Sequence, residues 1–150
     1  MKLAEALIVR ADLQTRQEQL RQRLRDNALV QEGEEPAEDP VVLLEEVERN
    51  ALRLEELITR INLTNAATVL DGKSLTELLA RREALTQRIS IFQSLLESAS
   101  KTVMRGSHSE VRICSTVDVR SLRKQADDLS AQLRALDTAI QSSNWTVELQ

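Results

Sequence analysis

The strongest constraint on this chain is a rhythm of apolar residues that alternates between spacings of three and four. The rhythm is unbroken in the last third of the chain, at Val119, Leu122, Ala126, Leu129, Leu133, Leu136 and Ile140. Residues at these spacings share one face of an α-helix, and an apolar face must be buried against a neighbour. A half-buried β-strand would instead alternate with a period of two. The rhythm therefore predicts a long helix packed against another helix.

Three earlier segments show the same rhythm, with polar interruptions in two of them. Its predicted positions are Leu3, Ala6, Arg10, Leu13, Gln17, Leu20 and Leu24, then Leu44, Val47, Ala51, Leu54, Ile58 and Ile61, then Leu78, Arg82, Leu85, Ile89, Phe92, Leu96 and Ala99. With 3 Gly, 2 Pro, one Phe, one Trp and no Tyr, the composition also speaks against sandwiches and barrels. We predict an all-α fold of four long helices in an antiparallel up-down bundle or coiled coil, with short strand-like connectors, built within one chain or completed by a second.

Start and stop signals place the helices within a single domain of residues 1–150, at about 3–28, 40–67, 74–103 and 117–142. Asp39 followed by Pro40 is a helix-start signal. Ser74 with Glu77, and Ser115 with Asp118, have capping-box spacing, and Gly106 is the predicted stop of the third helix. The acidic segment 31–40 between the first two helices, with Gly and two Pro, reads as an exposed loop.

Two kinds of connector remain open from the sequence. Asp71-Gly72 between short apolar pieces fits either a tight hairpin turn or a helix end followed by a loop. Residues 109–115 and 145–149 alternate polar and apolar side chains as short extended segments do. In the antiparallel arrangement these two segments lie at opposite ends, so we expect them to pair only between chains. The alternative within one chain pairs the tail with residues 68–70.

The charge balance excludes two classes of partner. Lys and Arg number 20 against 24 Asp and Glu, a net charge of -4, so no positive excess is present to neutralise phosphates. We expect no nucleic-acid partner and no membrane partner. Cys114 is the one cysteine, which suits a reducing compartment. Glu5 and Arg10 interrupt any apolar core of a signal peptide, and we therefore expect a cytoplasmic protein.

The polar interruptions of the rhythm are the candidates for a binding site. In the antiparallel arrangement, five residues lie toward one end of the bundle: Arg10, Asn62, Asn65, Arg82 and Trp145. Two guanidinium groups beside amides suit a phosphate or carboxylate ligand, because arginine offers two parallel hydrogen-bond donors. The alternative is structural. Each arginine then lies along the core and pairs at its edge with a carboxylate such as Glu5, Glu77 or Asp137, or the polar layer sets the helix register.

The sequence offers little for catalysis or for a cofactor. His108 is the one histidine and shares a short connector with Cys114, and we read the two as a loop imidazole and a half-buried thiol. A metal site needs several such ligands, and the chain has no glycine-rich phosphate loop. We therefore expect no metal and no other cofactor.

Four segments carry a resemblance to known proteins: EGEEPAEDP (residues 32–40), INLTNAAT (61–68), STVDV (115–119) and NWT (144–146). With these the chain resembles a family of small uncharacterised bacterial proteins, some of which are labelled septicolysin-like. That label implies a thiol-activated, cholesterol-dependent pore former. The chain departs from it, with one Trp, one Phe and too little length for large membrane-inserting hairpins. The resemblance supplies no catalytic residue.

Two functions from different classes follow. The first is a non-enzymatic cytoplasmic interaction or scaffold protein that self-associates, with further copies of itself or another protein as partner. Its expected contacts are Val111, Ile113 and Trp145. The second is a binder of a small anionic ligand, or an enzyme, that uses the five-residue pocket. A third candidate is a chaperone-like or nucleic-acid-associated coiled coil, and the acidic composition speaks against the nucleic-acid version.

Overall fold

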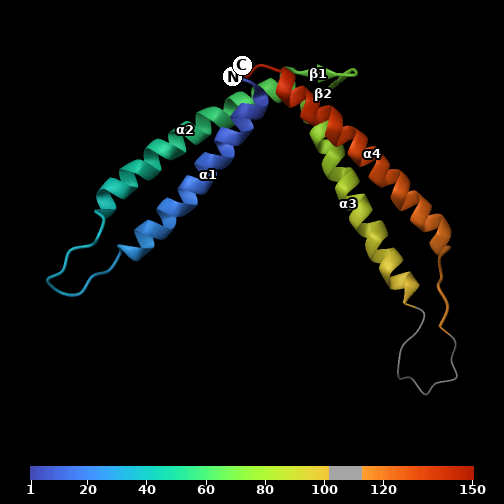
Figure 1. Cartoon of the computed structure of the whole chain (residues 1–150), viewed down its shortest axis with the longest axis horizontal. Helices are drawn as coiled ribbons and strands as arrows, with labels where there is room; N and C mark the ends of the chain where they lie inside the picture. Colours follow the sequence, from blue (N-terminus) through green and yellow to red (C-terminus); the bar gives the residue numbers. More distant parts are fainter. Residues whose placement is uncertain (102–112) are drawn as a thin grey trace. The chain divides into compact units, whose positions relative to one another are not determined.

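The computed structural model describes residues 1–101 and 113–150 (Figure 1). These residues form four helices and one two-stranded antiparallel sheet. In chain order the elements are α1 (Leu3–Asp26), α2 (Pro40–Ala67), β1 (Val69–Leu70), β2 (Lys73–Ser74), α3 (Leu75–Ser100) and α4 (Val119–Thr146). The prediction of an all-α fold built on four long helices is confirmed.

The chain divides into two compact units. Unit one contains Met1–Ser74 and Ser142–Gln150, and unit two contains Leu75–Gln141. Most of α4 therefore belongs to unit two, and its last turn belongs to unit one. Within unit one α1 lies beside α2, and within unit two α3 lies beside α4 (Figure 1). Each unit is thus built mainly from a pair of long helices.

The pair in unit one is antiparallel. Asn50 of α2 contacts Leu13 of α1, and Glu46 contacts Arg16. Later residues of α1 contact earlier residues of α2, which is the order of an antiparallel pair. The predicted seam of α1 is confirmed at its apolar positions, where Leu3, Ala6, Leu13 and Leu20 are buried.

The seam of α2 differs from the prediction by one position. Its buried residues are Leu43, Asn50, Leu57, Ile61 and Thr64. The predicted Leu44 is 53% exposed, and Ala51 and Ile58 are half-buried. The cause is that α2 carries two adjoining apolar rows, and the row that faces α1 contains an asparagine. An apolar criterion favours the neighbouring row because its members are Leu, Ala and Ile.

Unit two has its core between α3 and α4. Leu85, Ile89 and Leu129 are buried together, and Phe92, Leu133 and Leu136 pack against them. These six residues belong to the predicted seams of the third and fourth segments. The spacing of three and four therefore identified the buried faces of both helices.

Local hydrogen bonds decide where α2 and α4 begin. The Asp39 side chain accepts a hydrogen bond from the backbone N–H of Val41 at 2.8 Å, and Pro40 is the first residue of α2, as predicted. The prediction for α4 is wrong in one respect. Asp118, not Ser115, accepts bonds from the first turn, while the Ser115 hydroxyl bonds to Val117.

The later helix ends also differ from the predicted bounds. α3 ends at Ser100, earlier than residue 103, and the predicted stop at Gly106 lies outside the described residues. α4 continues to Thr146, four residues beyond the predicted 142, so that Trp145 is helical and not part of an extended tail. Ser143 and Asn144 in this last stretch are buried in spite of their polar side chains.

The hairpin interpretation of Asp71-Gly72 is confirmed. Val69 pairs with Ser74 and Leu70 with Lys73. Asp71 and Gly72 both have positive φ, at 51° and 78°. A type I′ turn, which is common in two-residue hairpins, needs positive φ at both central positions, and Asp-Gly is a preferred pair for it.

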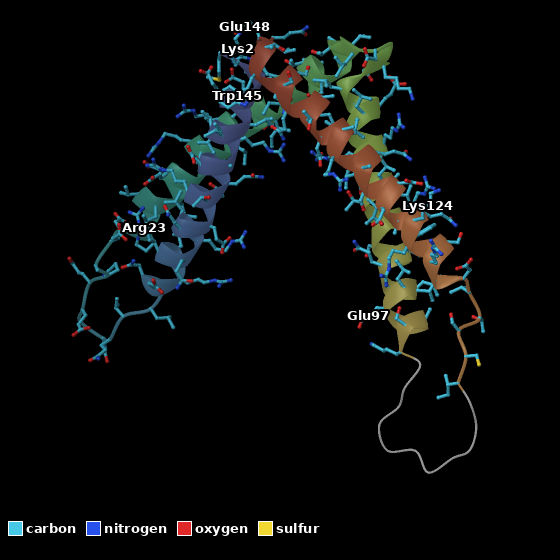
Figure 2. The ribbon with its side chains drawn as sticks, turned by 45° about the vertical axis from the view of Figure 1, so that its right-hand side comes forward. Lys2, Arg23, Glu97, Lys124, Trp145 and Glu148 are labelled. Atoms are coloured by element: carbon cyan, nitrogen blue, oxygen red, sulfur yellow. The ribbon has the colours of Figure 1, made fainter. Side chains whose placement is uncertain are left out.

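The two chain ends pair with each other inside unit one. Lys2 and Glu148 form an antiparallel bridge, with backbone hydrogen bonds from Leu3 N–H to Val147 O and from Leu149 N–H to Met1 O, both 2.9 Å. Figure 2 shows Lys2 and Glu148 close together at the chain ends. The tail therefore pairs with the start of its own chain, which corrects the predicted pairing with residues 68–70. The pairing between chains stays a prediction, and most of its other segment, 109–115, lies outside the described residues.

Candidate functional site

A buried polar contact lies inside the seam between α1 and α2. Asn50 is 6% exposed, and its Nδ2 donates to the carbonyl oxygen of Leu13 at 3.0 Å and to Gln17 Oε1 at 2.5 Å. A buried amide in a mostly apolar seam favours one register, because a shifted register leaves the amide without partners. Gln17 was recognised in the sequence as a polar interruption, and Asn50 was not.

Beside this contact an open groove runs along α1 and α2. Its volume is about 640 Å³, and its lining residues are Val9, Asp12, Leu13, Thr15, Arg16, Gln19, Arg23, Glu46 and Arg53. Arg49 and Asn50 line an adjoining cavity of about 360 Å³. Four guanidinium groups thus line the two cavities, with two carboxylates among them. We call these two cavities together the basic groove.

Ion pairs occupy part of the basic groove. Arg16 Nε donates to Glu46 Oε1 at 2.9 Å, and this bond, with the charges of the surrounding arginines, lowers the pKa of Glu46. Arg23 lies near the loop end of α1 (Figure 2) and donates to both carboxylate oxygens of Glu38, which lowers the pKa of Glu38 and raises that of Arg23. Among the residues that the structure describes, Arg53 has no ion pair.

The five residues of the predicted anion pocket belong to both units. Arg10 and Asn65 are half-buried, and Asn62 and Trp145 are exposed, all in unit one. Arg82 belongs to unit two, where its guanidinium lies 3.8 Å from the Asp137 carboxylate. Arg82 thus meets one of the three carboxylates named for the structural alternative. None of the five lines the basic groove.

Sequence reasoning missed the basic groove. Its arginines occur where helical spacing puts them on one side of each helix: Arg16 and Arg23 are seven apart, and Arg49 and Arg53 are four apart. That spacing was readable, but the side of α2 that faces α1 had to be known first. The one-position shift of the α2 seam therefore hid the groove as well.

The predicted contacts between chains are accessible where the structure describes them. Ile113 and Trp145 are exposed, and Val111 lies outside the described residues. Ile113 and the exposed thiol of Cys114 line a cavity of about 220 Å³ with residues from the end of α3. Within residues 1–101 and 113–150 no group of three or more His, Cys, Asp or Glu is placed to hold a metal ion.

Each unit also exposes an apolar row next to its buried seam. On α2 the row consists of Leu44, Glu48, Ala51, Glu55 and Ile58, and we call it the outer row of α2. On α3 it consists of Arg81, Ala84, Arg88, Ile91 and Leu95, and we call it the outer row of α3. Ile91 is 67% exposed and Leu95 is 42% exposed. Large apolar side chains thus face solvent on both rows, at Leu44 on α2 and at Ile91 and Leu95 on α3.

Comparison with known proteins identifies the family. The sequence pattern of a family of unknown function, DUF6847, matches residues 10–149. The chain belongs to this family. Among proteins with curated descriptions, none matches it.

A solved structure shares the fold of the whole chain. It is the crystal structure of a functionally unknown conserved protein from Corynebacterium diphtheriae, with 40% sequence identity and a TM-score of 0.95. The match covers 100% of this chain and 99% of that chain. The expected resemblance to uncharacterised bacterial proteins is confirmed at this level. No helix among the described residues is long and apolar enough to cross a membrane.

Proposed function

We propose that this chain is a non-enzymatic helical interaction protein that associates with further copies of itself. The observation that supports the proposal is the pair of exposed apolar rows, one on α2 and one on α3. Single exposed apolar residues are ordinary on protein surfaces, but contiguous ones mark interaction sites. Leu44, Ile91 and Leu95 each lie on the row beside a buried seam, which is where helices of a larger bundle make their next contact.

Burial of these side chains would contribute to association. Full burial of a Leu or Ile side chain stabilises by about 1.5–3 kcal/mol. Several such side chains offset part of the entropy that two molecules lose on association. The predicted contacts Ile113 and Trp145, both exposed, add to the accessible apolar surface.

Sedimentation velocity over a range of concentrations tests the proposal. We expect the weight-average mass to rise above the monomer mass of 16.9 kDa between about 1 µM and about 300 µM, the range in which weak to moderate complexes form. A mass that stays at 16.9 kDa over this whole range would contradict self-association. The proposal includes a cytoplasmic location, supported by the lone exposed thiol of Cys114.

The resemblance to septicolysin-like proteins stays a prediction. Pore formation, which that label implies, is not part of the proposed function. The chain has one Phe and one Trp to offer a membrane surface. We therefore assign its apolar rows to protein partners.

A second candidate, binding of a small anion, is favoured by one observation. Arg53 lines the basic groove without an ion pair among the described residues, so its guanidinium is available for a phosphate or carboxylate ligand. Inorganic phosphate as a probe should then raise the melting temperature of the wild type and not of Arg53→Met. Arg10→Met serves as the matched control from the predicted pocket. A phosphate shift that Arg10→Met abolishes and Arg53→Met keeps would instead favour the predicted pocket.

A further inference from the structure

We propose that the outer row of α2 docks against the outer row of α3 of a second copy of this chain. The inference rests on the proposed self-association and names the surfaces that carry it. Both rows alternate spacings of three and four, so each forms a continuous stripe along its helix. Because every copy carries both rows, a second copy is a partner that always has the matching surface.

The outer row of α2 is apolar with acidic interruptions. Leu44 is 53% exposed, and Ala51 and Ile58 are half-buried beside the seam with α1. Glu48 and Glu55 lie between these three, and both are exposed. Neither glutamate has an ion pair among the described residues, although Glu45 and Glu46 nearby do. The row therefore offers two exposed carboxylates that make no ion pair within the described residues.

The outer row of α3 has the same spacing with the opposite charge. Ala84, Ile91 and Leu95 are its apolar members, and all three are exposed. Arg81 comes before Ala84, and Arg88 lies between Ala84 and Ile91. Both arginines are exposed and have no ion pair among the described residues. This row therefore presents two guanidinium groups along an apolar stripe. Charge complementarity between stripes of equal spacing sets partner and register in helical assemblies.

An antiparallel register brings the two rows together residue by residue. It places Leu44 opposite Ile91, Ala51 opposite Ala84, Glu48 opposite Arg88 and Glu55 opposite Arg81. Large side chains then face large ones, and small face small. A parallel register also pairs the charges, but it sets Ile58 against Ile91 and leaves Leu44, the more exposed residue, uncovered. The antiparallel register therefore covers Leu44, which has more apolar surface left to bury than the half-buried Ile58.

Charge reversal on each row gives a direct test. The variants are Glu48→Lys with Glu55→Lys, which makes the α2 row basic, and Arg81→Glu with Arg88→Glu, which makes the α3 row acidic. Each variant alone then places like charges opposite each other, and we expect its self-association constant to fall at least roughly tenfold. An equimolar mixture of the two variants should recover association, because both contacts between unlike copies are complementary again.

Matched controls carry the same change in net charge on other exposed surfaces. Glu32→Lys with Glu35→Lys alters the loop before α2, and Arg123→Glu with Lys124→Glu alters α4, where Lys124 lies near the helix start (Figure 2). None of these four has an ion pair among the described residues. We expect the controls to change the association constant less than about twofold at physiological salt. Far-UV circular dichroism verifies that all variants keep their helix content.

The outcomes separate the two levels of the proposal. A wild type that stays monomeric overturns self-association and the docking of the rows together. A wild type that associates, but is weakened no more by the row variants than by the controls, overturns the docking alone. Failure of the mixed variants to recover association does the same. Mixing single variants tests direction: Glu48→Lys should be rescued by Arg88→Glu, and rescue by Arg81→Glu instead would overturn the antiparallel register.

Discussion

Replacing Asn50 tests whether the buried amide holds the α1–α2 pair together. The Asn50→Ala change removes the hydrogen bonds of Nδ2 to Leu13 O and Gln17 Oε1. A hydrogen bond contributes about 1 kcal/mol net to stability. The Leu13 carbonyl keeps its helical partner, and the half-buried Gln17 amide regains water. With the lost packing of the Asn50 side chain included, we expect the free energy of unfolding to fall by about 2 kcal/mol.

A double variant separates polar satisfaction from packing. Asn50→Leu together with Gln17→Leu makes the seam apolar at both positions. Because replacing both partners of a buried polar contact by apolar groups is close to neutral or stabilising, we expect this variant to be at least as stable as the wild type. Asn50→Leu alone should be less stable than the double variant, since it leaves the Gln17 amide against an apolar side chain.

Equilibrium urea unfolding followed by circular dichroism measures these free energies. Two results would refute the reasoning. One is an Asn50→Ala variant within about 0.5 kcal/mol of the wild type, the range of an ordinary surface substitution. The other is a double variant that is less stable than Asn50→Leu alone.

Three further predictions concern the seam, a cap and the chain ends. Leu43→Ala should cost about 2–4 kcal/mol, and Leu44→Ala in dilute solution less than about 0.5 kcal/mol; equal costs by urea unfolding would contradict the observed seam. Asp118→Ala should cost about 1 kcal/mol and lower the helix content, whereas Ser115→Ala should change neither. The pKa of Glu148 lies below its ordinary value of 4.5, held there by a lysine and by the α-amino group. Its stabilisation is therefore present above the unfolded pKa and lost as the pH falls through the lower folded value. In Glu148→Gln the free energy of unfolding should therefore fall less as the pH is lowered into the acid range. An unchanged pH dependence would contradict the role given to Glu148.

The sequence was sufficient where the signal was local and apolar. The seams of α1, α3 and α4 follow from spacing alone, and Asp71-Gly72 and Asp39-Pro40 act through their own backbone angles and hydrogen bonds. The α2 seam was shifted because Asn50 is polar by itself and satisfied only by its partners on α1. A pattern of apolar residues does not reveal a buried polar side chain, because its burial depends on hydrogen-bond partners on another helix.

Contacts between distant segments were beyond the sequence. The pairing of Lys2 with Glu148 depends on where the last turn of α4 arrives, and that turn was predicted to be extended. Of the candidate pocket, an edge carboxylate for each arginine was foreseen in kind, and Asp137, which follows the seam residue Leu136, is the one that Arg82 meets. The basic groove and the outer row of α2 depend on the true seam of α2, which was not evident from the sequence.

Native mass spectrometry of the wild-type protein tests the central claim most directly, because one spectrum reports how many copies associate and whether a small molecule stays bound. The proposed interaction protein predicts ions at multiples of the 16.9 kDa chain with no added mass. Monomer ions alone, at concentrations where sedimentation also gives the monomer mass, would contradict self-association. A monomer with a stoichiometric added mass would point instead to anion binding in the basic groove.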